Sequence, residues 1–288
     1  MSLITIVAQV VMYSAVAQDV ASPLFLLPSG TANASPYRRL LRFDADGSMK
    51  GVGGLGDLGP GYFRAVTWDG HANRILAVAE DLEAHRTMLL AIDPRDGVAS
   101  LLRFIDGAAE ELAVDPRTGA LFYWGVSAGR RALFIVWPDR PSLLAGAVFT
   151  PDLACKNLVW ADEIDGDRST AGLLTTCENG IIYRIAVDPI NENASFRKSA
   201  QRSSPYQKLF YDADAKRLVV LRETDGGIEF DKLNPDDGSW SNSDMSFTHE
   251  VFENEERLLI ALVPRHLSRP QCPCDPQPLD APRPREQK

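Results

Sequence analysis

The sequence predicts an all-β protein, a β-propeller of five blades, and three observations carry this prediction. Four segments repeat one order of short apolar strands and acidic turns. The starts of these four segments at Val66, Leu112, Leu158 and Leu209, and of the next at Val251, are spaced by 46, 46, 51 and 42 residues. Such a period with four strands per unit is typical of propellers. A β-sandwich or two small β domains is the alternative, and the regular spacing disfavours it.

Each of the four units is expected to supply four strands in chain order. The first unit covers segments 65–70, 74–81, 87–97 and 99–105, and the second covers 111–119, 120–126, 131–138 and 143–149. The third covers 158–166, 171–179, 181–189 and 195–201, and the fourth covers 209–214, 217–224, 228–238 and a polar strand that ends at Phe247.

The turns between these segments support the assignment. Residues 93–97 read Asp-Pro-Arg-Asp-Gly and residues 115–119 read Asp-Pro-Arg-Thr-Gly. Proline presets φ for the first turn position, and glycine tolerates a positive φ at the last. Strands that are apolar on both faces, such as residues 120–124, suit a position between two stacked sheets.

Both ends of the chain are expected to share one further blade. Segments 40–44 and 49–55 would be its third and fourth strands, and segments 248–252 and 257–264 its first and second. Closing the ring in this way removes open sheet edges. Residues 24–27 form a spare strand that would allow six blades instead. The domain is therefore expected to cover residues 18–267, with a disordered Pro-rich tail at 268–288.

Composition excludes several classes of protein. Hydrophobic residues make up 45% of the chain, so it is neither disordered nor collagen-like. The formal net charge of -9 argues against a nucleic-acid partner, because proteins that bind the phosphate backbone carry a basic patch.

The first residues predict export. Segment 3–17 is uncharged and ends in Ala15-Val16-Ala17, the small-x-small pattern of a signal peptidase site, so residues 1–17 are interpreted as a signal peptide. An uncleaved anchor is the alternative, although the segment is shorter than the ~20 residues that span a bilayer. We expect a secreted, extracellular protein, periplasmic if the host is bacterial, with no membrane span after cleavage.

Export implies an oxidising compartment, in which cysteines pair. We expect a disulfide between Cys155 and Cys177, with two buried free thiols as the alternative. The Cys272-Pro273-Cys274 pair lies in the tail, where bonding to each other or to another chain is favoured over metal binding. Asn33 and Asn193 stand in Asn-Ala-Ser patterns and are glycosylation acceptors in a eukaryotic host.

Residues 111–125, ELAVDPRTGALFYWG, resemble the repeat of the LDL-receptor class B, or YWTD, propellers. Here the family's Tyr-Trp-Thr-Asp reads Tyr123-Trp124-Gly125-Val126, without its threonine and aspartate. Similar text occurs in NHL repeats and in gluconolactonase-like propellers. The YWTD resemblance implies an extracellular protein that binds other proteins on one face.

A polar residue precedes the apolar part of each expected first strand. In a propeller the first strands line the central channel, so these residues would form a ring at one mouth. The ring contains Arg64, Glu111, Asn157, Lys208 and Glu250, with His249 beside it. It could bind a protein or glycan ligand or a cation. Alternatively, its members only solvate the mouth and pair with one another. The tryptophans at 68, 124, 137 and 160 are interpreted as packing between blades.

An enzyme is the second functional interpretation. Nucleophile-elbow, phosphate-loop, dinucleotide and HExxH motifs are absent from the sequence. Gluconolactonase-like propellers hold one divalent metal by Glu, Asn and Asp side chains, and it polarises an ester carbonyl. That resemblance implies Glu111, Asn157 and Glu250 as metal ligands in a lactonase or esterase. A divalent cation is the only cofactor that the sequence suggests.

Overall fold

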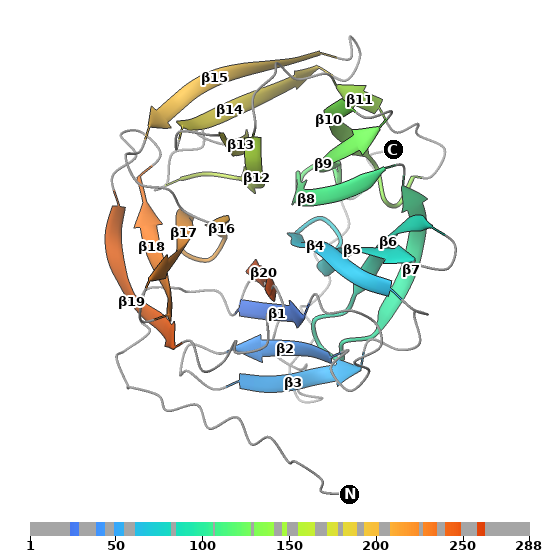
Figure 1. The fold of residues 1–288 in the computed structure, drawn as a ribbon, viewed down its shortest axis with the longest axis horizontal. Coiled ribbons are helices and arrows are strands. Elements are labelled where there is room, and N and C mark those ends of the chain that lie inside the picture. Colours follow the sequence, from blue (N-terminus) through green and yellow to red (C-terminus); the bar gives the residue numbers. More distant parts are fainter. Residues whose placement is uncertain are drawn as a thin grey trace, which may run out of the picture.

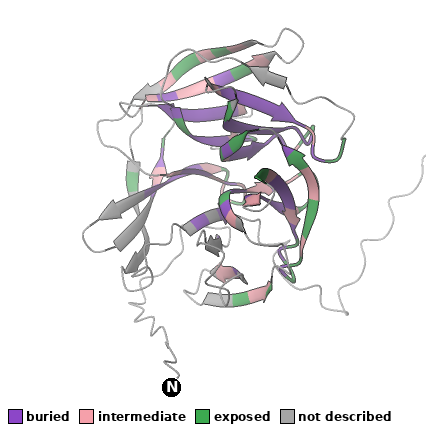
Figure 2. Cartoon of the chain, turned by 45° about the vertical axis from the view of Figure 1, so that its right-hand side comes forward, coloured by how far each residue is buried: buried purple, intermediate pink, exposed green. Residues whose placement is uncertain are grey.

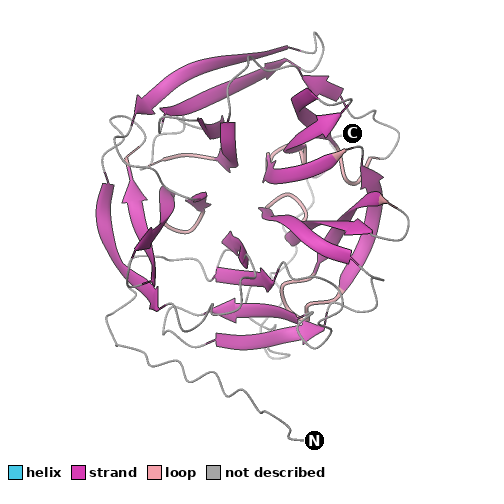
Figure 3. Cartoon of the chain, viewed as in Figure 1, coloured by secondary structure: helices cyan, strands magenta, loops and turns pink. Residues whose placement is uncertain are grey.

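The computed structural model describes residues 24–28, 39–43, 49–54, 61–81, 85–105, 107–127, 130–140, 146–148, 155–164, 172–177, 181–188, 193–201, 208–224, 227–234, 240–248 and 258–262. The expectations for the signal segment, Asn33, His249, Glu250 and the tail cysteines concern residues outside these ranges. In the described part of the chain every regular element is a strand (Figure 3). No helix found there has the length and apolar character needed to cross a bilayer.

The described strands form five four-stranded antiparallel sheets, arranged around a central channel as a β-propeller (Figure 1). The first sheet contains β4 (Gly61–Asp69), β5 (Arg74–Asp81), β6 (Arg86–Ile92) and β7 (Ala99–Ile105). The second contains β8 (Ala108–Val114), β9 (Leu121–Ser127), β10 (Arg130–Val136) and β11 (Gly146–Val148). The third contains β12 (Cys155–Ala161), β13 (Gly172–Cys177), β14 (Ile181–Asp188) and β15 (Asn193–Gln201). The fourth contains β16 (Lys208–Asp212), β17 (Arg217–Thr224), β18 (Gly227–Leu233) and β19 (Trp240–Thr248).

The fifth sheet closes the ring and differs from the expected arrangement. Its order is β20 (Leu258–Leu262), β1 (Leu24–Pro28), β2 (Arg39–Phe43) and β3 (Met49–Gly54). The carboxyl-terminal part therefore supplies one strand and the amino-terminal part three, so residues 24–27 belong to the second strand and are not spare. The expected first strand at 248–252 is wrong, because Thr248 ends β19 and β20 is innermost. An innermost strand must be apolar on both faces, which LLIAL satisfies and THEVF does not.

The innermost strands surround the channel in chain order. Each contacts the next around the ring, and β20 contacts both β16 and β4. The first strand of every sheet lies at the channel. Residues at the same position of the repeat therefore lie at the same height along the channel wall. This geometry makes the channel the place where equivalent side chains from different sheets meet.

Apolar clusters between neighbouring sheets hold the ring together. One cluster joins the closing sheet to the first sheet through Phe25, Leu40 and Ile75. The next joins the first and second sheets, where Tyr123 stacks on Phe134 with ring centroids 4.9 Å apart. Figure 2 shows buried positions mainly on strands nearer the channel and exposed positions along outer strands. Each fully buried large side chain contributes about 1.5–3 kcal/mol.

The tryptophans take two kinds of position. Trp124 is fully buried, as expected for packing between sheets. Trp68, Trp137 and Trp160 are only half-buried at the edges of the apolar clusters. Two of these three, Trp68 and Trp160, also line the channel.

Candidate ligand-binding site

An ion pair spans the channel at one level of the innermost strands. Nζ of Lys208, the first residue of β16, lies 2.8 Å from Oε2 of Glu111 in β8. The sheet of β12 lies between these two strands, so the pair joins sheets that are not neighbours. The two side chains are only 19% and 22% exposed, and their charges therefore interact with limited screening by water. Two of the ring residues predicted from sequence thus neutralise each other.

A cavity of about 230 Å³ extends from this ion pair toward the turns that join first and second strands. Its wall contains two levels of side chains from the innermost strands. The level nearer the ion pair contains Val66, Leu112, Leu158 and Leu209. The level nearer the turns contains Trp68, Val114, Trp160, Tyr211 and Ala261. The site predicted from the sequence lies at the opposite mouth of the channel, where the innermost strands begin.

The register of the sheets explains why the outer level contains these residues. Trp68, Val114, Trp160 and Tyr211 each pair with the first apolar residue of the following strand, which is Ile75, Leu121, Leu173 or Leu218. In the closing sheet, Ala261 pairs with Phe25, the second residue of β1. The repeat therefore brings one residue from each sheet to the same height, and three of the five are aromatic.

Sequence reasoning missed this aromatic level as a site. Its signal is the recurrence of a large residue before the turn aspartate, in TWDG at 67–70, AVDP at 113–116 and FYDA at 210–213. The same recurrence also fits packing between sheets, which was the interpretation given to Trp68 and Trp160.

Buried aspartates fix the turns at the rim of the cavity. Oδ1 of Asp69 accepts hydrogen bonds from the backbone N–H groups of His71 and Ala72, and its Oδ2 accepts one from Nε of Arg74. Asp115 and Asp212 occupy the equivalent positions and accept hydrogen bonds from the backbone of their own turns. Each side chain replaces backbone partners that the tight turn cannot supply.

The third sheet departs from this pattern and exposes a carboxylate. Ala161 stands where the first, second and fourth sheets carry the turn aspartate, and Asp162 follows it at the cavity wall. Oδ1 of Asp162 accepts a hydrogen bond from Nε1 of Trp160 at 3.3 Å. The residue is exposed, but partial burial of its carboxyl among the surrounding groups raises its pKa. None of the ion pairs in the described part of the chain includes Asp162.

Tyr211 is fixed by the backbone of the third sheet. Its hydroxyl donates a hydrogen bond to the carbonyl oxygen of Glu163 at 2.7 Å and accepts one from the Glu163 N–H at 3.3 Å. Burial raises the pKa of Tyr211 to about 12, so the phenol stays neutral at physiological pH. The hydroxyl therefore has its hydrogen-bond partners within the protein, and the side chain forms part of the cavity wall.

The remaining residues of the predicted ring have other partners. Arg64 lies within β4, where the register with β5 shifts, and its Nε donates to Oε2 of Glu80 at 3.0 Å. It also contacts the hydroxyl of Tyr62. Asn157 is buried at a similar irregularity in β12 and donates to the hydroxyl of Thr176 at 2.8 Å. Both residues lie inside strands rather than before them, because the innermost strands begin earlier than the apolar pattern indicated.

The structure describes two of the three metal ligands implied by the gluconolactonase-like resemblance, and both have partners within the protein. Glu111 is neutralised by Lys208, Asn157 binds Thr176, and Glu250 lies outside the described ranges. No group of three or more His, Cys, Asp or Glu side chains in the described ranges could hold a metal ion. One buried oxygen, Oδ1 of Asn157, has no hydrogen-bond partner.

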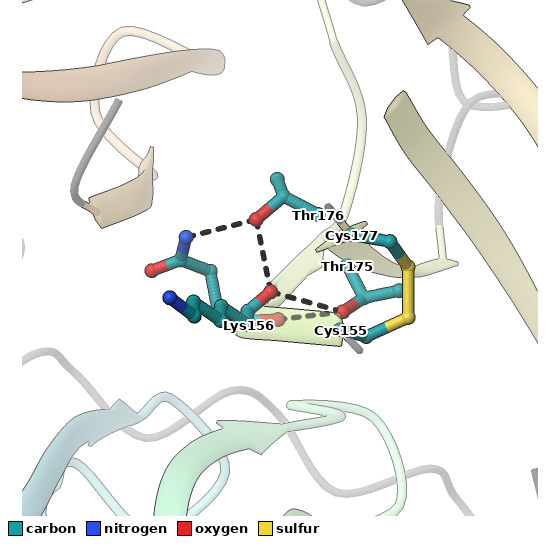
Figure 4. The surroundings of a disulfide bond; sticks show 6 residues. Cys155, Lys156, Thr175, Thr176 and Cys177 are labelled. Carbon is teal, nitrogen blue, oxygen red and sulfur yellow. Dashed lines mark hydrogen bonds between the residues drawn. A yellow bond between two sulfur atoms is a disulfide. The ribbon is translucent and has the colours of Figure 1, made fainter. Parts of the chain in front are cut away.

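A disulfide adjoins the innermost strand of the third sheet (Figure 4). It joins Cys155 and Cys177, which face each other across β12 and β13 and are the pair expected from export. Beside it, the Thr175 hydroxyl donates to the backbone oxygen of Asn157 at 2.7 Å, and the Thr176 hydroxyl donates to that of Lys156 at 2.9 Å. The bond and these hydrogen bonds stabilise the irregular start of β12.

The fold is shared with known propellers. No protein-family model and no curated protein matches the sequence. The chain is similar to TolB from Acinetobacter baumannii, with a TM-score of 0.50 and 16% identity over 78% of this chain and 53% of that one. It therefore spans about half the length of TolB. It is also similar to a chain of a nidogen/laminin complex, with a TM-score of 0.52 and 12% identity over 83% of this chain and 98% of that one. At these identities the likeness supports the propeller fold alone.

Proposed function

We propose that this protein is an exported β-propeller that binds a protein or glycan ligand through its central channel, in the cavity above the Glu111–Lys208 ion pair. The observation that carries the proposal is the cavity itself, whose outer level contains Trp68, Trp160 and Tyr211. Binding sites are typically concave and apolar, with a few fixed polar groups. The uncharged segment 3–17 and the Cys155–Cys177 disulfide support export.

The ion pair gives the cavity a defined inner end. Because Lys208 and Glu111 neutralise each other, the channel at that level presents little net charge. A ligand that enters past the turns would contact aromatic side chains first and the ion pair last. Half-buried aromatic side chains offer a large contact area with few rotatable bonds, which lowers the entropic cost of binding.

The proposal is tested by removing one aromatic wall at a time. The secreted protein is screened against a glycan array and against extracellular proteins, and the Trp68→Leu and Trp160→Leu variants are screened in parallel. We expect both variants to lose at least about tenfold in affinity for any ligand that the wild type binds. Trp137→Leu is the matched control, since Trp137 is half-buried at the same apolar cluster as Trp160 but does not line the cavity.

A ligand whose affinity is unchanged in both cavity variants binds elsewhere and contradicts the proposal. Folding of each variant is checked by near-UV circular dichroism, so that lost binding is not mistaken for lost structure.

A metal-dependent lactonase or esterase is the second candidate, and one observation favours it. Oδ1 of Asn157 is buried without a partner, and a carbonyl-type oxygen of this kind can ligate a hard cation. Elemental analysis of the purified protein before and after chelation tests this candidate. One divalent ion per chain, lost in Asn157→Ala, would favour the enzyme, and a metal-free folded protein would exclude it.

A further inference from the structure

We propose that the group bound in the cavity is an organic cation, an alkylammonium or a guanidinium, held between Trp68, Trp160 and Tyr211 and neutralised by Asp162. This inference rests on the proposed function and specifies the chemistry of its ligand. The cation would be either the end of a basic side chain on a protein partner or a small free amine.

The arrangement of the aromatic residues is the first argument. They come from three different sheets, stand at one level of the channel and line a single cavity of about 230 Å³. All three are half-buried, so part of each side chain is accessible. The face of an aromatic ring carries partial negative charge and attracts a cation within about 6 Å of its centre.

The distribution of charge is the second argument. The carboxylates near the cavity have cationic partners, with the exception of Asp162. The ion pairs are Glu111 with Lys208, Asp115 with Arg117, and Glu163 with Lys216. Asp162 accepts the Trp160 N–H and forms no direct ion pair among the described residues, so its negative charge is balanced only from a distance, by the Arg117 guanidinium over the Trp160 ring. A cationic ligand would neutralise the Asp162 carboxylate directly.

Trp160 already interacts with a cation of the protein itself. The guanidinium carbon of Arg117 lies 5.2 Å from the centre of the Trp160 ring. The Arg117 side chain is 65% exposed and has one ion pair, with Asp115 at 3.2 Å, so it can move at little cost. The pair shows that a guanidinium fits against this ring.

The hydrogen-bonding groups of the wall disfavour a neutral sugar. Sugars are recognised through many hydroxyl groups that need donors and acceptors. The Tyr211 hydroxyl is occupied by the Glu163 backbone, and the Trp160 N–H by Asp162. These two residues therefore contribute mainly ring faces, and on Trp160, which also stacks on Phe122, a ligand cation would take the place of the Arg117 guanidinium.

The test is titration of the folded protein with defined probes, followed by tryptophan fluorescence and calorimetry. The probes are tetramethylammonium, the Nα-acetyl methylamides of lysine and arginine, and the neutral Nζ-acetylated lysine analogue. We expect the cations to bind and the neutral analogue to bind at least about tenfold more weakly. If the source is a basic side chain, the amino-acid derivatives bind more tightly than tetramethylammonium, and if it is a free amine, the order is reversed.

Two substitutions separate the role of charge from a structural role. Asp162→Asn keeps the hydrogen-bond acceptor for Trp160 and removes the charge, so we expect about five- to tenfold weaker cation binding. Arg117→Met removes a competing cation, so we expect tighter binding, which a merely destabilising change would not produce. Asp96→Asn is the matched control, since its carboxylate caps an exposed turn through the Val98 N–H and does not line the cavity.

The outcomes distinguish this inference from the proposed function. Equal binding of the neutral analogue, or unchanged cation binding in Asp162→Asn, overturns the cation and leaves a ligand site in the channel. If no cation binds while the array yields a glycan whose affinity falls in Trp160→Leu, the inference fails and the proposed function holds. If the array and partner screens also yield nothing that depends on the cavity residues, both fail.

Discussion

The Glu111–Lys208 pair shows how a single contact can join sheets that are far apart in the ring. Both side chains are about four-fifths covered, so removing one partner leaves the other charge poorly solvated. We expect Glu111→Gln and Lys208→Met each to lower the free energy of unfolding by about 1–3 kcal/mol. In the double variant the loss should be smaller than the sum. Urea unfolding of the four proteins measures this coupling, and strictly additive losses would mean that the pair contributes nothing.

Tyr211 predicts a loss of stability at alkaline pH. Its pKa is about 12 in the folded protein, against about 10 in an unfolded chain, because burial disfavours the phenolate. This contribution is complete below about pH 10 and is lost as the pH rises toward the folded-state value. Phenolate absorbance should include a late-titrating tyrosine that is missing in Tyr211→Phe. Titration of all tyrosines at one ordinary pKa would contradict the assignment.

At the residue scale, the site could be predicted only in part from the sequence. The polar positions Glu111, Asn157 and Lys208 were predicted to lie at the channel, and the structure places them on its innermost strands. The aromatic level was not predicted as a site, because Trp68 and Trp160 both pack against apolar clusters and line the cavity. Sequence alone does not separate two roles that one side chain performs at once.

At the scale of the strand pair, the Cys155–Cys177 disulfide stabilises β12, one of three innermost strands whose register shifts. It closes a separation of 22 residues, which in the chain-entropy view stabilises the fold by about 3 kcal/mol. We expect the Cys155→Ser, Cys177→Ser double variant to unfold at correspondingly lower urea concentration. Reductant should lower the stability of the wild type to that of the variant and leave the variant unchanged. A wild type that resists this shift under full reduction would contradict the expectation.

The strands themselves were largely predictable, and the reason is local. Turn aspartates such as Asp69 and Asp115 mark the ends of three of the first strands, and their hydrogen bonds involve residues only two to five positions away. The closing sheet was predicted less well, because Phe25 and Ala261 are paired partners that no local pattern connects. Its strand order depends on packing between distant segments.

For the whole molecule, β20 closes the ring by contacting both β16 and β4. Ala261 is 2% exposed and packs in the cluster that joins the closing sheet to the first sheet, whereas Val98 is 56% exposed. We expect Ala261→Asp to cost more than about 3 kcal/mol, since it buries an unpaired charge. Val98→Asp should change stability by less than about 0.5 kcal/mol. Thermal unfolding compares the two, and equal melting temperatures would show that closure contributes little.

The pairing of Leu24 with Leu262 also sets the time at which the ring can close. During synthesis the first four sheets can form as their segments emerge, but β1 has no inner partner until β20 has left the ribosome. Contacts between such distant segments form slowly. For the exported protein proposed above, this delay would leave the ring open, without the β1–β20 pairing, while the nascent chain passes through a translocation pore. The last strand, β20, would then pair with β1 and close the ring after export.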